Sequence, residues 1–130
     1  MMLTLPPSVR IFVAVEPVDA RKSFDGLAAV VRDSLGGDPM TGHMFVFINR
    51  RGDMVQILFW DRTGFVIMRK RLEAGTFRVV RSANGSNSHV EMDAADLGLM
   101  LEGIELGTVK RRKRFKLEAQ LPIEVESSTV

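Results

Sequence analysis

The chain has 130 residues, of which 45% are apolar and 26% charged, with no cysteine and a formal net charge of +2. This length and composition suit one packed domain, and the lack of cysteine excludes disulfides, thiolate nucleophiles and cysteine-bound zinc. Residues 1–109 carry 12 Lys/Arg against 13 Asp/Glu and residues 110–130 carry 6 against 3, so the positive charge is concentrated near one end.

The first part of the chain predicts one strand and one amphipathic helix. Residues 10–16 (RIFVAVE) are rich in β-branched and aromatic side chains and are followed by Pro17, which is typical of a short strand. Asp19 can then cap a helix, and Gly36 and Gly37 are expected to end it. The apolar positions of this helix share one face of a 3.6-residue period and are Phe24, Leu27, Ala28, Val31 and Leu35.

Three apolar segments with very short polar connections come next, at residues 44–48, 54–60 and 65–72. The connections, 49–53 and 61–64, are too short to hold a crossover helix, so neighbouring segments must pair antiparallel. Gly52 and Gly64 are expected to supply the positive φ that such tight reversals need. This stretch therefore predicts a β-meander.

The last structured part predicts two strands and a second helix. Residues 76–81 are expected to add a fourth strand to the meander sheet, and residues 89–92 to pair back after a reversal at Asn84-Gly85. Asp93 resembles a helix N-cap, with Asp96 favourably placed in the first turn. The apolar stripe of this helix consists of Leu97, Met100, Leu101 and Ile104. Gly103 or Gly107 is expected to end it.

These elements predict an α+β fold, in which an antiparallel β-meander sheet of about five strands packs against two amphipathic helices on one side. We expect residues 1–109 to form this single domain and residues 110–130 to form a flexible basic tail. No apolar run nears the ~18 residues of a membrane span, and the N-terminus lacks a signal-peptide pattern. A cytoplasmic protein without a membrane partner is expected.

Patterns that would indicate catalysis are weak. His43 and His89 each stand alone at the start of a predicted strand, without a second ligand at metal-binding spacing, although a long-range pair stays open. Asp53 and Asp61 lie at turns that face opposite ends of the sheet and should not converge on metal ions. We therefore expect no enzyme activity, no catalytic residues, no cofactor and no metal.

The basic residues of the meander are candidates for nucleic-acid binding. Arg50 and Arg51 occupy the predicted first turn, and Arg69, Lys70 and Arg71 lie on the predicted third strand. Because side chains alternate along a strand, Arg69 and Arg71 should share one face and Lys70 the other. An exposed Trp60 near these cations would suit base stacking. The alternative is that Trp60 is a core residue and that the cations protect the sheet edge from aggregation.

A second group of candidates forms the heptapeptide KRRKRFK at residues 110–116. So dense a block of positive charge repels itself and is typical of a disordered arm that binds phosphates. The cations of this arm are Lys110, Arg111, Arg112, Lys113, Arg114 and Lys116.

Six segments in a fixed order form a pattern that covers roughly residues 5–107. They are D-x-R at 19–21, FDGLAAVV at 24–31, DPMTGHMFVFINRRGD at 38–53, ILFWDRTGF at 57–65, KRLEAGTF at 70–77 and LEGIEL at 101–106. This pattern resembles the small accessory proteins (TnpB, or Orf2-like) encoded beside the transposase in the insertion-sequence-sixty-six family of bacterial mobile elements. Gln56 and Thr76 depart from it, at positions where a lysine and an arginine are common. The resemblance implies participation in transposition and carries no catalytic residues.

Two functions agree with these observations. The first is a non-catalytic accessory protein that assists the transposase by contacting DNA through the basic residues. The second is an adaptor that docks on the transposase or another element-encoded protein without contacting DNA, which eight methionines and an uncovered sheet face would favour. Association of the chain with a second copy is compatible with both. An enzyme with a dispersed site ranks last.

Overall fold

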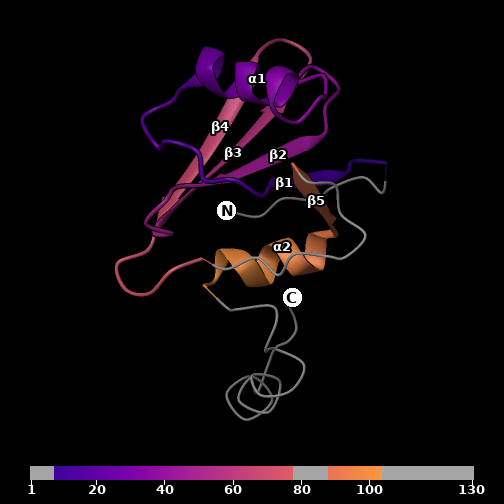
Figure 1. The fold of residues 1–130 in the computed structure, drawn as a ribbon. Coiled ribbons are helices and arrows are strands. Elements are labelled where there is room, and N and C mark those ends of the chain that lie inside the picture. Colours follow the sequence, from indigo (N-terminus) through magenta and orange to yellow (C-terminus); the bar gives the residue numbers. More distant parts are fainter. Residues whose placement is uncertain (1–7, 78–87, 104–130) are drawn as a thin grey trace.

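The computed structural model describes residues 8–77 and 88–103, which form a five-stranded sheet and two helices (Figure 1). In chain order the elements are β1 (Ile11–Ala14), α1 (Phe24–Asp33), β2 (Met44–Ile48), β3 (Met54–Trp60), β4 (Phe65–Arg71), β5 (His89–Met92) and α2 (Ala94–Leu101). The strand order across the sheet is β4-β3-β2-β1-β5. None of the helices in these described ranges is long and apolar enough to cross a membrane.

The predicted meander is confirmed. β2 pairs antiparallel with β3, and β3 pairs antiparallel with β4 over seven residue pairs from Met54↔Arg71 to Trp60↔Phe65. In the first turn Gly52 has the expected positive φ of 82°. In the second turn the expectation for Gly64 is wrong, because Arg62 is the residue with positive φ, at 85°. The Asp61 side chain holds this turn by accepting hydrogen bonds from the backbone amides of Thr63 and Gly64.

The prediction of a purely antiparallel sheet is wrong, because the sheet is mixed. β1 pairs parallel with β2, and the 29-residue connection between them contains α1, as a parallel crossover requires. β5 pairs antiparallel with β1, at the other end of the described strand order from the meander strand β4. Thr76 and Phe77 lie outside any strand, and residues 78–81 and the Asn84-Gly85 reversal lie outside the described residues.

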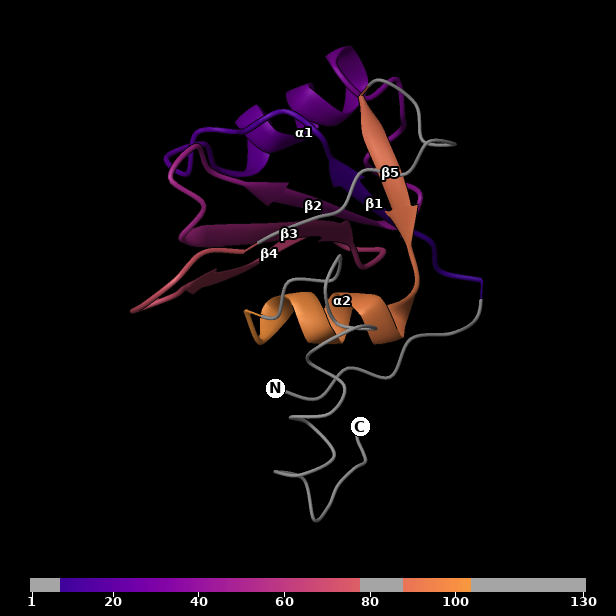
Figure 2. The same ribbon diagram turned by 60° about the horizontal axis from the view of Figure 1, so that its bottom comes forward.

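The two helices cover opposite faces of the sheet, so the expectation that both lie on one side is also wrong (Figures 1 and 2). Met44 and Val46 of β2 pack in one apolar cluster with Leu97 and Met100 of α2. The alternate residues Phe45 and Phe47 pack in a second cluster with Leu27 and Val31 of α1. The continuous apolar sequence of β2, MFVFI, has a physical reason here, because a strand covered on both faces needs apolar side chains at every position.

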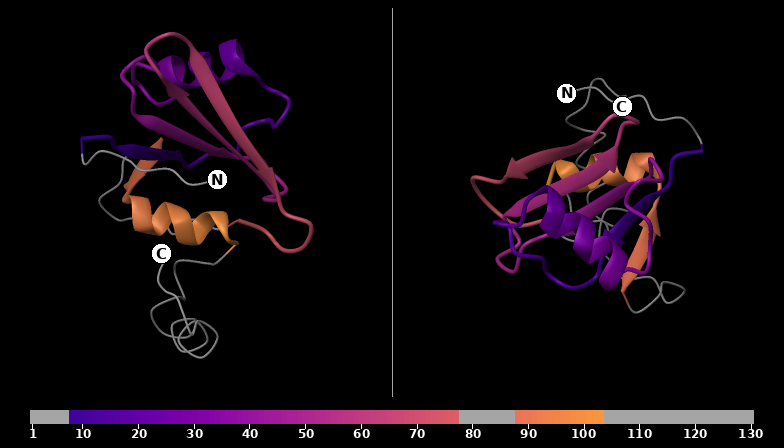
Figure 3. Two further views of the ribbon diagram at one scale, coloured as in Figure 1. Left: turned by 180° about the vertical axis from the view of Figure 1, so that it is seen from behind. Right: turned by 90° about the horizontal axis from the view of Figure 1, so that it is seen from above.

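The predicted stripe of α1 is confirmed at its centre. Leu27, Ala28 and Val31 are buried against the sheet, and Figure 3 shows α1 lying across the strands when seen from above. Phe24 is the exception, since it is 45% exposed at the start of the helix. The N-cap is Ser23 and not the expected Asp19, whose carboxylate binds Arg21 instead.

The second helix begins and ends as its sequence predicts. Asp93 is the N-cap, and its carboxylate accepts a hydrogen bond of 2.8 Å from the backbone amide of Asp96. Leu97 and Met100 are buried, and Gly103, with φ of 83°, follows the last turn. Ile104, expected in the same stripe, lies outside the described residues.

Candidate nucleic-acid interface

The turn between β2 and β3 presents two arginines at one end of the sheet. Asn49 holds this turn, because its side-chain oxygen accepts hydrogen bonds from the backbone amides of Gly52 and Met54, at 2.9 and 3.1 Å. Its amide group also donates to the Asp53 carboxylate, at 2.8 Å. Arg50 and Arg51 are exposed at the tip and make no hydrogen bond or ion pair with any residue that the structure describes. Their charges are therefore available to a ligand.

Arg71 brings β4 into the same corner of the molecule. The pKa of Asp53 is lowered, first by the hydrogen bond from Asn49 and then by the charges of Arg51 and Arg71. Both guanidinium groups are thus near one carboxylate, although they come from a turn and from the end of a strand. Arg71 also forms an ion pair of 3.5 Å with Glu73, in which both side chains are mostly exposed. An exposed pair of this kind is weak and can be exchanged for a phosphate contact.

Arg69 lies on the same face of β4 as Arg71, two residues away. Its Nε atom donates a 2.9 Å hydrogen bond to Oε1 of Gln56, the residue directly opposite on β3. Gln56 is only 1% exposed and is the buried polar residue of the described core. Arg69 therefore satisfies a buried carbonyl oxygen while the rest of its side chain is exposed on the α1 face of the sheet.

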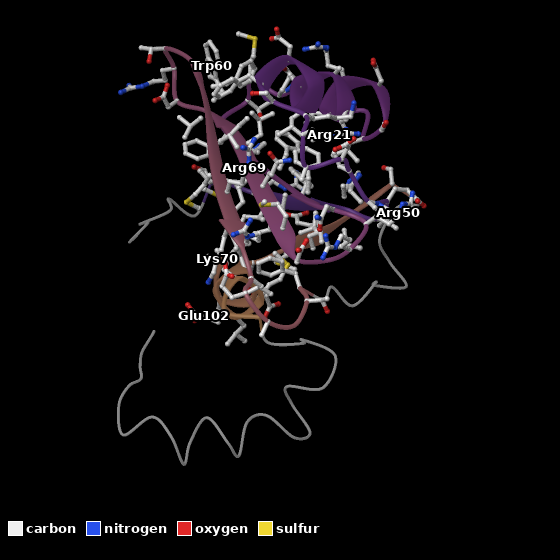
Figure 4. The ribbon with its side chains drawn as sticks, turned by 90° about the vertical axis from the view of Figure 1, so that its left-hand side faces the viewer. Arg21, Arg50, Trp60, Arg69, Lys70 and Glu102 are labelled. Atoms are coloured by element: carbon white, nitrogen blue, oxygen red, sulfur yellow. The ribbon has the colours of Figure 1, made fainter. Side chains whose placement is uncertain are left out.

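Lys70 points to the opposite face, as the alternation of side chains predicts. Its Nζ atom donates a 2.7 Å hydrogen bond to the carbonyl oxygen of Leu101, in the last turn of α2. A cation at this position also interacts favourably with the helix dipole. Figure 4 shows Lys70 beside α2 and Arg69 on the side toward α1. The structure thus separates Lys70 from the arginines with which it was grouped.

Arg21 is a further cation in this region that motif reasoning did not assign to the site. Asp19 and Arg21 form a close ion pair, with Arg21 Nη2 at 2.8 Å from Asp19 Oδ2, and the Arg21 side chain is 90% exposed. The hydrogen bonds from Arg21 lower the pKa of Asp19 to about 2. The signal in the sequence was the D-x-R motif, which was used only as part of the family pattern, while Asp19 alone was interpreted as a helix cap.

An open hollow lies between the segment that carries Asp19 and the β2–β3 turn. It has a volume of about 480 Å³ and is lined by Pro17, Val18, Asp19, Ala20, Asn49, Arg50 and Arg51. The backbone amide of Val18 donates to the carbonyl of Ile48, at 3.0 Å, and fixes the two segments relative to each other. Figure 4 shows Arg21 and Arg50 on the same side of the molecule. We call Arg21, Arg50, Arg51, Arg69 and Arg71 the basic corner.

Trp60 does not belong to the basic corner. It lies at the far end of β3 from the 49–53 turn, about 20 Å along a strand of seven residues. It is half-buried and packs edge-to-face on Phe65, with ring centroids 5.0 Å apart. The stacking platform that would have accompanied Arg50 and Arg51 is therefore not supplied by Trp60.

Both histidines lie against the ring of Phe12, which their spacing in the sequence could not show. Both rings contact Phe12 of β1 edge-on, with centroids at 5.9 Å for His43 and 5.5 Å for His89. Nδ1 of His43 accepts a hydrogen bond from the backbone amide of Arg10, and His89 pairs with Ser88. They line a pocket of about 240 Å³ with Phe45 and Leu35 at the other end of β2. No group of three or more His, Asp or Glu residues in the described ranges could hold a metal ion.

The basic arm, residues 110–116, lies outside the described residues, and its role stays a prediction. The last described residue is Gly103, next to Leu72 just beyond β4: a Cβ atom placed on Gly103 would be 3.7 Å from the Leu72 methyl groups. Six residues separate Gly103 from Lys110, so the seven steps between their Cα atoms span at most about 24 Å. Lys110 is therefore at most about this distance from Gly103, which lies beside the end of β4.

The chain matches one protein family and two related proteins over most of its length. The family described as "IS66 Orf2 like protein" matches residues 9–111. Two uncharacterized proteins of Sinorhizobium fredii, y4jC and y4hO, are 35% and 34% identical to the chain over 104 residues. The aligned region is 80% of this chain in both cases, and 86% of y4jC and 88% of y4hO. No solved structure matches.

Proposed function

Because the chain belongs to the family of IS66 Orf2-like proteins, we propose that it is a non-catalytic accessory protein of a bacterial insertion sequence that assists transposition by contacting DNA. The basic corner and the basic arm would make the contacts. The observation that carries this proposal is that cations from three separate segments lie at one corner of the sheet: Arg21, then Arg50 and Arg51, then Arg69 and Arg71. Convergence at a surface is what a phosphate-binding site needs, and no packing requirement explains it for Arg50 and Arg51.

The contacts we propose are to phosphates and not to base edges. The basic corner offers exposed guanidinium groups, and Trp60, the aromatic side chain proposed for base stacking, lies at the other end of β3. Contacts to phosphates position a protein on DNA without reading its sequence. We therefore propose binding with little sequence preference, in which the choice of the element ends is left to the transposase.

Salt-dependent binding of the full chain to duplex DNA, followed by fluorescence anisotropy, tests this proposal. The logarithm of affinity falls with the logarithm of salt concentration by about 0.9 for each phosphate contact. Replacing Arg50 and Arg51 with Gln should lower the slope by about 2, and replacing residues 110–114 with Ala should lower it by about 4 to 5. Arg32→Gln is the matched control, because Arg32 is an exposed cation in the last turn of α1, outside the basic corner.

The results separate the two sites and the two functions. If only the arm variant lowered the salt slope, DNA contact would be restricted to the arm. If Arg32→Gln lowered the slope as much for each charge removed as the Arg50 and Arg51 replacement, binding would reflect unspecific attraction to the net charge. If the unaltered chain bound no DNA even at low salt, the proposal would be abandoned. Docking on the transposase without DNA contact would then be the better explanation, and co-purification with the transposase would test it.

A further inference from the structure

β4 is an open edge of the sheet in the described part of the chain. It pairs with β3 on one side and occupies the end of the strand order, far from β5 (Figure 2). The chain that follows turns at Gly75 and returns toward β3, where the backbone amide of Phe77 donates to the carbonyl of Gly52, at 2.7 Å. Phe77 is buried in the cluster on the α2 face. The described residues after β4 therefore leave its outer edge accessible.

The hydrogen bonds of the β3–β4 hairpin determine which backbone groups face outward. The amide of Asp61 donates to the carbonyl of Gly64, and the amide of Leu72 donates to the carbonyl of Asp53. Hydrogen-bonded and non-hydrogen-bonded residue pairs alternate along an antiparallel ladder. These two bonded pairs therefore determine which of the pairs between them are hydrogen-bonded. By this alternation, Val66, Met68 and Lys70 form backbone hydrogen bonds with β3. The outward backbone groups belong to the other residues of the strand, which are Phe65, Ile67, Arg69 and Arg71.

The side chains of β4 divide into two halves. Residues 65–68 are apolar and half-buried, whereas residues 69–71 are basic and exposed. Parallel pairing of two such strands would place each cation beside its own counterpart, and like charges directly opposite are destabilising. Antiparallel pairing centred on Met68 places Arg71 opposite Phe65, Lys70 opposite Val66 and Arg69 opposite Ile67. Every cation then faces an apolar side chain.

This register also satisfies the outward backbone groups. Phe65 pairs with Arg71 and Ile67 with Arg69, so all four outward residues of each strand find bonding partners. A shift of the centre to Ile67 would leave Arg71 opposite Thr63 in the hairpin turn, and a centre at Arg69 would place two arginines in contact. We propose that the β4 edge pairs antiparallel with the β4 edge of a second copy of the chain, centred on Met68.

The symmetry of this pairing has a consequence for the basic corner. Two antiparallel strands within one sheet are related by a twofold axis perpendicular to the sheet, so the α1 faces of both copies lie on the same side. Arg69 and Arg71 of each copy would then belong to one continuous surface with twofold symmetry. The pairing itself does not depend on DNA binding, and its failure would leave the proposed function unaffected.

Single cysteines test the register directly, since the chain has no native cysteine. In the proposed dimer, position 68 lies opposite itself as a non-bonded pair, with Cα atoms about 4.5 Å apart, which a disulfide can bridge. Met68→Cys should therefore form covalent dimers on mild oxidation. Val66→Cys is the matched control on the same face and strand, because two copies of position 66 would be about 13 Å apart. We expect it to cross-link about tenfold more slowly or not at all.

A second pair of variants guards against a defect caused by the loss of Met68. A mixture of Val66→Cys and Lys70→Cys chains should give the mixed covalent dimer, since these positions lie opposite each other. Sedimentation of the unaltered chain and of the Arg50→Gln, Arg51→Gln variant should show dimers for both. Monomers at the highest soluble concentration would overturn the proposal, and so would dimers in which Met68→Cys cross-links no faster than Val66→Cys.

Discussion

Removal of the Arg69 side chain should destabilise the fold, although Arg69 is an exposed surface residue. Arg69 Nε is the hydrogen-bond partner of Gln56 Oε1, and Gln56 is 1% exposed. Arg69→Met keeps much of the aliphatic stem but leaves the buried carbonyl oxygen without this donor, which should cost about 1–3 kcal/mol. Gln56→Met has the smaller effect, under about 1.5 kcal/mol, because the Arg69 guanidinium that loses its partner can be hydrated.

Urea unfolding of the four members of this double-mutant cycle measures the effect. The double variant Arg69→Met, Gln56→Met should be close in stability to Gln56→Met alone, because no buried acceptor is left to satisfy. The slope of free energy against urea should stay constant, so that a shift in midpoint reports stability alone. The reasoning is refuted if Arg69→Met costs less than about 0.3 kcal/mol, or if the two single effects add without coupling.

Three further predictions concern the faces and ends of the elements. Leu27→Ala should cost about 2–5 kcal/mol in urea unfolding, since Leu27 is fully buried between α1 and the sheet, and a cost under about 0.5 kcal/mol would contradict this packing. Lys70→Met should lower stability by about 0.3–1 kcal/mol through loss of the contact with the C-terminal end of α2, and should leave DNA affinity unchanged at a given salt concentration if Lys70 serves only the fold. The Asp19 pKa of about 2 lies below the ordinary 3.8, so its ion pair stabilises the fold above about pH 4 and this contribution is lost between about pH 4 and pH 2. In the Asp19→Asn variant the melting temperature should therefore fall less steeply as the pH is lowered through that window. An unchanged dependence on pH would rule out the ion pair with Arg21 in solution.

The elements that short-range patterns determine were predictable from the sequence. The meander follows from two connections too short for any crossover. Local capping and backbone conformation explain why α2 begins after its N-cap Asp93 and ends before Gly103. Which face of the sheet each helix covers was not predictable in the same way. The run MFVFI of β2 has no alternation, so it carries no information on which side is covered, and burial on both sides is the reason for it.

Long-range neighbours were also beyond the sequence. The parallel pairing of β1 with β2 places residue 10 beside residue 43, and the pairing of β1 with β5 places Phe12 beside Glu91, so that both histidines reach one phenylalanine ring. Nothing in the spacing of His43 and His89 indicates that they share a contact with Phe12. Arg21 was missed for a similar reason, since its position depends on how the segment before α1 packs against the β2–β3 turn.

The number of arginines in the basic corner overstates how many of them are free to contact DNA phosphates. Arg21 is paired with Asp19 and Arg71 with Glu73, so a neighbouring carboxylate already offsets part of the charge of each, and Arg69 uses its Nε atom on Gln56. Arg50 and Arg51 have no such contact with the described residues, and the turn that carries them is already held in place by Asn49. Binding through these two arginines therefore needs no rearrangement of the fold. One copy of the chain would gain a salt slope of only about 2 from them, and a pair of copies joined at β4 would gain about 4 on one face of the sheet. In the proposed function, the two arginines of one copy would therefore contribute less of the salt slope than the arm, for which about 4 to 5 is expected.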